Sequence, residues 1–106
     1  MPPLFWLTPR AHQDLDEIWN FIARDSVDAA NRVESAILRT CGKVARNPFM
    51  GRRRPEITTR PVRFSVVTRY PNYIVVYRAD TKPIQIVAIV HGKRNIQRAL
   101  EQADDS

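Results

Sequence analysis

The chain has 106 residues, of which 43% are hydrophobic and 26% charged, and it carries a net charge of +6 and one cysteine. This length suits one domain over residues 1–106, and a lone cysteine excludes an internal disulfide bond and a multi-cysteine metal site. No apolar run approaches the roughly 18 residues that a membrane-spanning helix needs, and the opening segment lacks the pattern of a signal peptide. We therefore expect a cytoplasmic protein without membrane association, metal or other cofactor.

The positive charge is unevenly distributed along the chain. Residues 1–50 contain six Lys or Arg and six Asp or Glu, whereas residues 51–100 contain eleven and two. A positive field of this kind attracts phosphate groups or an acidic protein segment. The alternative interpretation is a solvated surface that only keeps the protein soluble.

The first half of the chain predicts a short strand followed by two helices. The apolar run Leu4 to Leu7 predicts the strand, and Thr8-Pro9 is typical of a helix start, with apolar residues at helical spacing as far as Arg24. Ser26 predicts the N-cap of a second helix, which Asn47-Pro48 ends. Because the link between the helices is very short, we expect an antiparallel helical hairpin.

The second half predicts three strands, at residues 62–68, 73–78 and 84–91. Pro71-Asn72 marks the first turn between them and residues 80–83 mark the second. Short turns indicate an antiparallel arrangement. The last strand is apolar on both faces, which places it in the middle of the sheet.

These elements predict an α+β fold with the order β-α-α-β-β-β and a short C-terminal helix beginning near Asn95. The helical hairpin is expected to pack on one face of an antiparallel sheet. The segment from Asn47 to Pro61 is expected to be a loop, with Phe49 and Met50 tucked onto the core.

Strand alternation then sorts the side chains by face. The simplest arrangement turns Val62, Phe64 and Val66 toward the helices and leaves Arg63 and His91 together on the open face. Four further cations are expected to rim this surface: Arg60, Arg69, Lys93 and Arg94. A register slip of one residue would invert the assignment.

A histidine flanked by arginines is the minimum for acid/base chemistry on a phosphodiester, because imidazole can move a proton and guanidinium groups hold phosphate oxygens. The sequence supplies no second acid/base group after His91, which favours a binding role for it. Cys41 lies on an apolar helical stripe and is expected to be a core thiol. There is no phosphate-binding glycine loop and no metal-ligand cluster.

Several segments together resemble toxins of the ParE branch of the RelE/ParE superfamily, the toxic halves of bacterial type II toxin-antitoxin pairs. The similarity covers nearly the whole chain. The segments that carry it are Leu15 to Trp19 with Ile22-Ala23, Ala30 with Arg32-Val33, Asn47-Pro48 through Arg52, Val62 to Phe64, Tyr73 to Arg78, and Ile89 to Arg94.

The resemblance implies a toxin that arrests growth unless a cognate ParD-like antitoxin binds it. ParE-like members poison DNA gyrase, whereas RelE-like members cut messenger RNA in the ribosome. RelE-like catalysis here would depend on His91, Arg63 and Arg94, but no tyrosine follows the Gly-Lys-Arg-Asn segment. We therefore favour a non-hydrolytic gyrase inhibitor over a ribosome-dependent endoribonuclease; a non-toxic nucleic-acid-binding module is the third interpretation.

The same interpretation assigns target binding to the basic surface, namely Arg60, Arg63, Arg69, His91, Lys93 and Arg94. The antitoxin is expected to place an acidic, partly disordered segment on this basic half, folding on binding over the helical hairpin and a sheet edge. The expected assembly is a hetero-oligomer of toxin and antitoxin.

Overall fold

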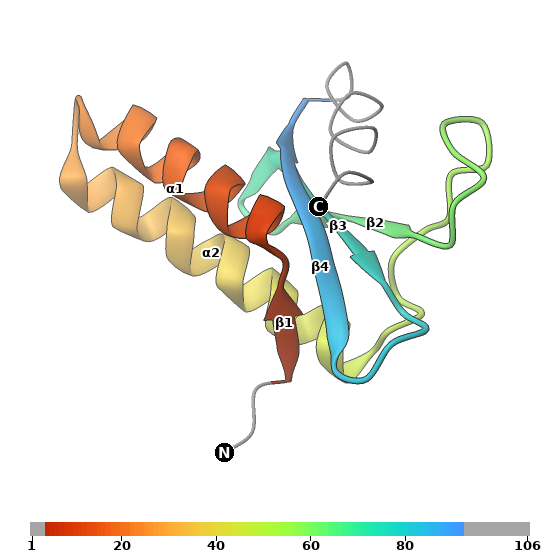
Figure 1. Cartoon of the computed structure of the whole chain (residues 1–106). Helices are drawn as coiled ribbons and strands as arrows, with labels where there is room; N and C mark the ends of the chain where they lie inside the picture. The colour runs from red at the N-terminus through yellow and green to blue at the C-terminus, as the bar shows by residue number, and fades with distance from the viewer. Residues whose placement is uncertain (1–3, 93–106) are drawn as a thin grey trace.

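The computed structural model describes residues 4–92, so the predicted helix near Asn95 lies outside the described residues. Two helices pack against a four-stranded sheet, which confirms the predicted α+β fold (Figure 1). Neither helix is long and apolar enough within this range to cross a membrane. The elements are β1 (Phe5–Leu7), α1 (Pro9–Ala23), α2 (Val27–Arg46), β2 (Arg63–Val67), β3 (Tyr70–Arg78) and β4 (Ile84–His91).

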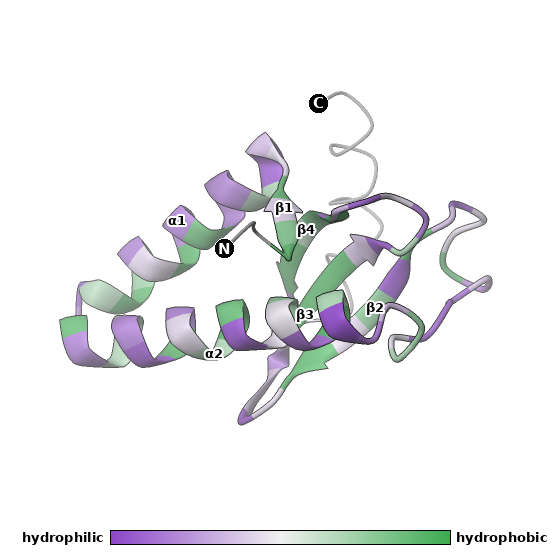
Figure 2. Cartoon of the chain, turned by 90° about the horizontal axis from the view of Figure 1, so that it is seen from below, coloured by the Kyte–Doolittle hydropathy of each residue, from purple (hydrophilic) through white to green (hydrophobic). Residues whose placement is uncertain are grey.

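Both helices begin at the predicted caps. The Thr8 side chain accepts a hydrogen bond from the Ala11 N–H, and the Ser26 side chain accepts one from the Ala29 N–H, each at 3.1 Å. These bonds satisfy backbone donors that the first helical turn leaves unpaired. Each helix turns an apolar stripe toward the sheet and a polar surface outward (Figure 2).

The strand order in the sheet is β1-β4-β3-β2, so β4 is central, as predicted. Strands β2, β3 and β4 form the expected antiparallel arrangement, whereas β1 pairs with β4 in parallel. The sheet is therefore mixed. A parallel pair needs a long crossover, and the chain between β1 and β4 provides one because it contains both helices and two strands.

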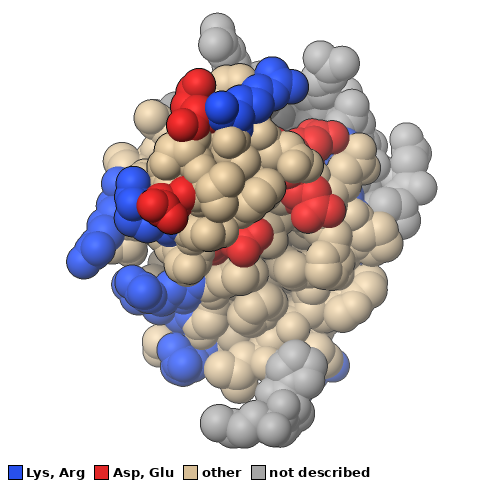
Figure 3. Space-filling view, turned by 90° about the vertical axis from the view of Figure 1, so that its left-hand side faces the viewer, with Lys and Arg blue, Asp and Glu red and all other residues tan. Residues whose placement is uncertain are grey.

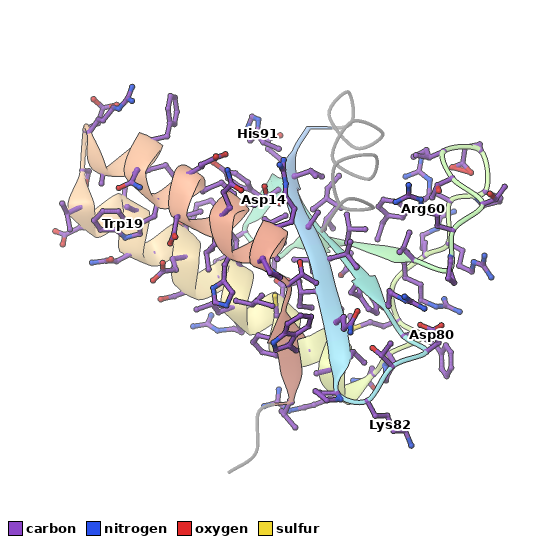
Figure 4. The ribbon with its side chains drawn as sticks, in the orientation of Figure 1. Asp14, Trp19, Arg60, Asp80, Lys82 and His91 are labelled. Carbon is purple, nitrogen blue, oxygen red and sulfur yellow. The ribbon has the colours of Figure 1, made fainter. Side chains whose placement is uncertain are left out.

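Helix α1 completes the edge of β4 beyond the short strand β1. The Thr8 hydroxyl donates a hydrogen bond to the Val87 carbonyl at 3.0 Å, and the buried Asp14 carboxylate accepts one from the Ile89 N–H at 3.0 Å. Side chains of α1 and its cap thus bind β4 backbone groups that β1 does not reach. Figure 4 shows Asp14 on α1, facing this strand.

The expected assignment of side chains to sheet faces is wrong. Val62 and Phe64 do not face the helices but are buried with Ile57 in a second apolar cluster. Arg63 instead shares the helix side with its cross-strand partner Tyr77, which belongs to the cluster that includes both helices. The sheet is apolar on both faces, so alternation alone could not tell which set meets the helices.

A register shift explains the corresponding change in β4. Val76 pairs with Ala88 and Tyr77 with Ile86, which leaves Val87 as an extra residue. A bulge of this kind reverses the faces of the residues after it. Ile84, Ile86 and Ile89 therefore all reach the helix side, while Ala88 and Val90 reach the second cluster.

The first hairpin turn lies earlier than predicted. Val67 pairs with Tyr70, so the turn is Thr68-Arg69, and Pro71-Asn72 lies inside β3. Arg69 has a φ of 77°, in the left-handed region that non-glycine residues seldom adopt. A two-residue hairpin turn requires such a conformation, although neither turn residue is a glycine or asparagine, which would have indicated it in the sequence.

Candidate target-binding surface

The loop between α2 and β2, residues 47–62, is fixed to the sheet by Tyr77. The Tyr77 hydroxyl donates a hydrogen bond to the Pro48 carbonyl at 2.7 Å and accepts one from the Gly51 N–H at 2.9 Å. Backbone hydrogen bonds in both directions between Arg52 and Phe64 then attach the loop to the edge of β2. The start of the loop is therefore ordered by contacts with two strands.

Arg63 adds a third attachment. Its Nη1 donates to the Gly51 carbonyl at 2.8 Å and lies 3.5 Å from the Phe49 carbonyl. Its guanidinium carbon also lies 4.9 Å from the centroid of the Phe49 ring, a cation–π distance. Arg63, a predicted target-binding residue, thus holds the loop that carries Phe49.

Phe49 and Met50 project into solvent, contrary to the expectation that they tuck onto the core. Their side chains are 75% and 52% exposed. The core position belongs to Gly51, which is buried against the Tyr77 ring. Two large apolar side chains held outward by a well-anchored loop, next to the exposed Arg52 and Arg53, form a surface suited to a macromolecular partner.

The sequence predicted a loop here but wrongly placed the side chains of Phe49 and Met50 on the core. The sequence feature that could have indicated their exposure is their position between Pro48 and Gly51, directly before three consecutive arginines. The buried small residue, not the large ones, makes the close approach to the sheet.

The other predicted residues lie elsewhere. His91 ends β4 and meets the Tyr73 ring edge-on, with centroids 4.9 Å apart. Tyr73 is its cross-strand partner, whereas Tyr77 is the partner of Arg63. Four residues of an extended strand span about 13 Å, so Arg63 and His91 lie at opposite ends of the sheet.

The described members of the predicted surface consequently form two groups. Arg60 and Arg63 belong to the end of the sheet beside the 47–62 loop, and Arg69 and His91 belong to the other end. Figure 4 shows Arg60 and His91 well separated. Lys93 and Arg94 lie outside the described residues. Arg63 and His91 share the helix side of the sheet, not the opposite face, and do not meet around one phosphate.

Two buried titratable groups, Cys41 and Tyr77, belong to the core. Burial raises the pKa of the Cys41 thiol to about 12, which fits the predicted core thiol rather than a nucleophile. Burial also raises the pKa of Tyr77, against the opposing effect of its hydrogen bond from Gly51. Within residues 4–92, no group of three or more His, Cys, Asp or Glu side chains is placed to hold a metal ion.

A comparison with known families identifies the chain. Residues 6–96 match the sequence profile of the ParE toxin of the type II toxin-antitoxin system parDE. The chain belongs to the ParE toxin family. The match includes both helices, the exposed loop and all three antiparallel strands, so it covers every element that carries the predicted surface.

A solved structure agrees with the fold of this ParE-family chain. The chromosomal ParDE toxin-antitoxin system from P. aeruginosa superposes with a TM-score of 0.70 at 22% identity, covering 84% of this chain and 95% of that chain. None of the curated proteins is significantly similar in sequence. The chain is thus a type II toxin by family, with a fold that a ParDE system shares.

Proposed function

We propose that this ParE-family toxin arrests growth in the cytoplasm by poisoning DNA gyrase without hydrolysing nucleic acid itself. The family match over residues 6–96 carries the proposal. The separation of Arg63 from His91 supports a binding mechanism, because these two residues cannot act together on one phosphate. The exposed Phe49 and Met50 beside two arginines offer a surface for a large target.

Purified gyrase with supercoiled plasmid tests this proposal. We expect the toxin to inhibit supercoiling and to leave linear plasmid covalently attached to gyrase after denaturation. A double variant, Phe49→Ser with Met50→Ser, should weaken both effects while keeping the melting temperature, because these side chains are exposed. Unchanged supercoiling with no trapped DNA at saturating toxin would contradict the proposal, and ribosome-dependent cleavage of messenger RNA would instead assign the endoribonuclease function.

A ParD-like antitoxin is the proposed partner, binding through an acidic segment that folds on this chain. The helical hairpin offers it apolar contacts, because Phe21 and Val27 near the tip are 68% and 54% exposed. Strand β1 offers a sheet edge, and its Trp6 is 48% exposed. An antitoxin segment could therefore bind the hairpin as a helix and add a strand to the edge of β1.

Co-expression with the neighbouring gene product tests the partner. The two chains should co-purify as a hetero-oligomer, and growth should resume. Phe21→Ser should weaken the complex by tenfold or more, whereas Phe49→Ser, in the loop, should leave it intact. If both variants bind the antitoxin as the native toxin does, the hairpin is not the antitoxin site.

A further inference from the structure

Helix α2 carries a row of cations on its solvent face. Arg32, Arg39, Lys43 and Arg46 follow one another at spacings of seven, four and three residues, which places them along one side of the helix. We refer to these four residues as the α2 stripe. At 1.5 Å per residue the stripe is about 21 Å long.

The side chains of the stripe are not paired with anions among the described residues, although Asp28 lies one turn before Arg32 on the same side of α2. None of its four side chains forms an ion pair with another described residue, although Lys43 contacts the Thr68 hydroxyl at 3.4 Å. Helix α1, in contrast, contains three acidic residues and one arginine. Viewed from the hairpin tip, Lys and Arg gather mainly on the left, where one acidic side chain lies beside the upper of them and none lies beside those at the lower left (Figure 3). The other Asp and Glu side chains lie at the upper left, the centre and the right.

A pocket of about 250 Å³ opens between α2 and the β2–β3 turn. It is smaller than the roughly 300–1,000 Å³ of small-molecule sites, which suits a single chemical group. Arg69 reaches it from the turn, on a backbone held in the left-handed region. The lining residues are Asn31, Arg32, Ser35, Ala36, Arg39, Arg69 and Tyr70.

The polar groups of this pocket are mainly hydrogen-bond donors. Three arginines line it, and no aspartate or glutamate does so among the described residues. The Asn31 side-chain oxygen accepts a hydrogen bond from the Trp19 indole N–H at 2.9 Å, which fixes the orientation of the amide because indole is only a donor. The other polar atom of the Asn31 side chain is the amide nitrogen, which can only donate. Such a site complements a group that only accepts, as phosphate does.

We propose that the α2 stripe and Arg69 bind the backbone of duplex DNA, with one phosphate in the pocket. None of the exposed large apolar side chains of the described residues belongs to the stripe or the pocket. Protein interfaces are centred on apolar or aromatic anchors, whereas DNA-binding surfaces are polar and strongly positive. A linear cationic helix face is therefore a better match to a phosphate backbone than to a protein.

Fluorescence anisotropy with a short labelled duplex and the purified full chain tests this inference, at salt concentrations between about 50 and 200 mM. The test variant is R32Q/R39Q/R69Q, and the matched control R24Q/R78Q/K82Q removes the same charge from surface positions outside the stripe and the 47–62 loop. We expect the test variant to bind at least tenfold more weakly. The slope of log K against log salt concentration should also become shallower by about 2 to 3, because each phosphate contact contributes about 0.9 to it. The control should keep the slope.

Thermal melting of both triple variants checks that they are folded. If the melting temperature of the test variant is lowered, the single variants Arg39→Gln and Arg69→Gly replace it. Each should change the salt slope by about 1. Equal loss of affinity in test and control variants would overturn the inference, because it would show only a general charge effect. Absence of DNA binding by the native chain at low salt would overturn it as well.

A polyglutamate peptide tests whether the stripe instead binds an acidic protein segment. Binding of this peptide that depends on the three arginines, without a matching dependence for DNA, would assign the stripe to an acidic protein segment and overturn the inference. The assay contains no gyrase, so its outcome is separate from the proposed function. A toxin that binds DNA through the stripe but leaves gyrase unaffected would refute only the latter.

Discussion

Gly51 determines how the 47–62 loop meets the sheet. A Cβ atom at this position would lie 2.4 Å from the Tyr77 hydroxyl oxygen and 2.7 Å from its ring. Tyr77 is fully buried and hydrogen-bonded to the loop, so it has no room to withdraw. The absence of a side chain at Gly51 therefore permits both loop hydrogen bonds and directs Phe49 and Met50 outward.

Gly51→Ala should lower the free energy of unfolding by about 1–3 kcal/mol, because the added methyl group overpacks a buried site. Urea denaturation followed by circular dichroism measures the change. Gly42→Ala is the control: an added Cβ there meets its nearest atom at 3.9 Å, and alanine in a helix should raise stability by about 0.5–1 kcal/mol. Equal stability of the Gly51→Ala and native chains would show that the loop does not need the close approach.

Arg63→Ala should lower the free energy of unfolding by about 0.5–1.5 kcal/mol, since it removes a hydrogen bond to the Gly51 carbonyl. It should also speed proteolytic cleavage within residues 47–62. Arg53→Ala, at an exposed position of the same loop, serves as the control and should change neither quantity. If cleavage of the loop is not faster in Arg63→Ala, the guanidinium group does not hold the loop.

Among the secondary-structure elements, α1 and β4 are joined by the buried carboxyl group of Asp14, which accepts a hydrogen bond from the Ile89 N–H. Burial raises the pKa of Asp14, and this effect outweighs the hydrogen bond from Ile89 and the attraction of Arg10, both of which lower it. The Arg10 Nε lies 2.9 Å from the carboxylate. The ionised side chain therefore costs stability relative to its protonated form, although its hydrogen bond joins the two elements.

The pH dependence of stability follows from that raised pKa. A carboxyl group with a higher pKa in the folded than in the unfolded chain binds its proton more tightly when folded, so its contribution to stability grows as pH falls through the folded pKa. The contribution is complete below the unfolded value of 3.8 and is lost as pH rises through the folded pKa.

Asp14→Asn removes this titration. The difference in melting temperature between the native chain and Asp14→Asn should therefore shift in favour of the native chain as pH falls from neutrality toward 4. Thermal melts of both chains across that interval measure it. A constant difference, or a shift in favour of the variant, would contradict the raised pKa.

At the scale of the whole molecule, the sequence predicted the helices, the order of elements and the central strand, because caps, helical spacing and a doubly apolar run are local signals. It did not predict the sheet faces. The bulge at Val87 and the turn at Arg69 depend on pairing between strands, and neither position carries a glycine or proline that would mark it.

The predicted target surface was likewise correct in what depends on local sequence and wrong in what depends on strand pairing. Composition located the basic half of the chain, but only the strand register shows that Arg63 and His91 lie at opposite ends of the sheet. The pocket beside α2 joins residues from two parts of the chain, Arg32 and Arg39 on the helix and Arg69 in the turn. Helical spacing alone would have revealed the α2 stripe, whereas the pocket required the tertiary structure.

Gyrase poisoning is tested by inducing this toxin in growing cells and measuring covalent gyrase–DNA complexes. We expect growth to stop as gyrase accumulates in covalent complexes with chromosomal DNA, while existing messenger RNA remains intact. Co-expression of the cognate antitoxin should prevent both effects. Growth arrest with cleaved messenger RNA and no covalent gyrase–DNA complexes would show that the toxin does not act by poisoning gyrase.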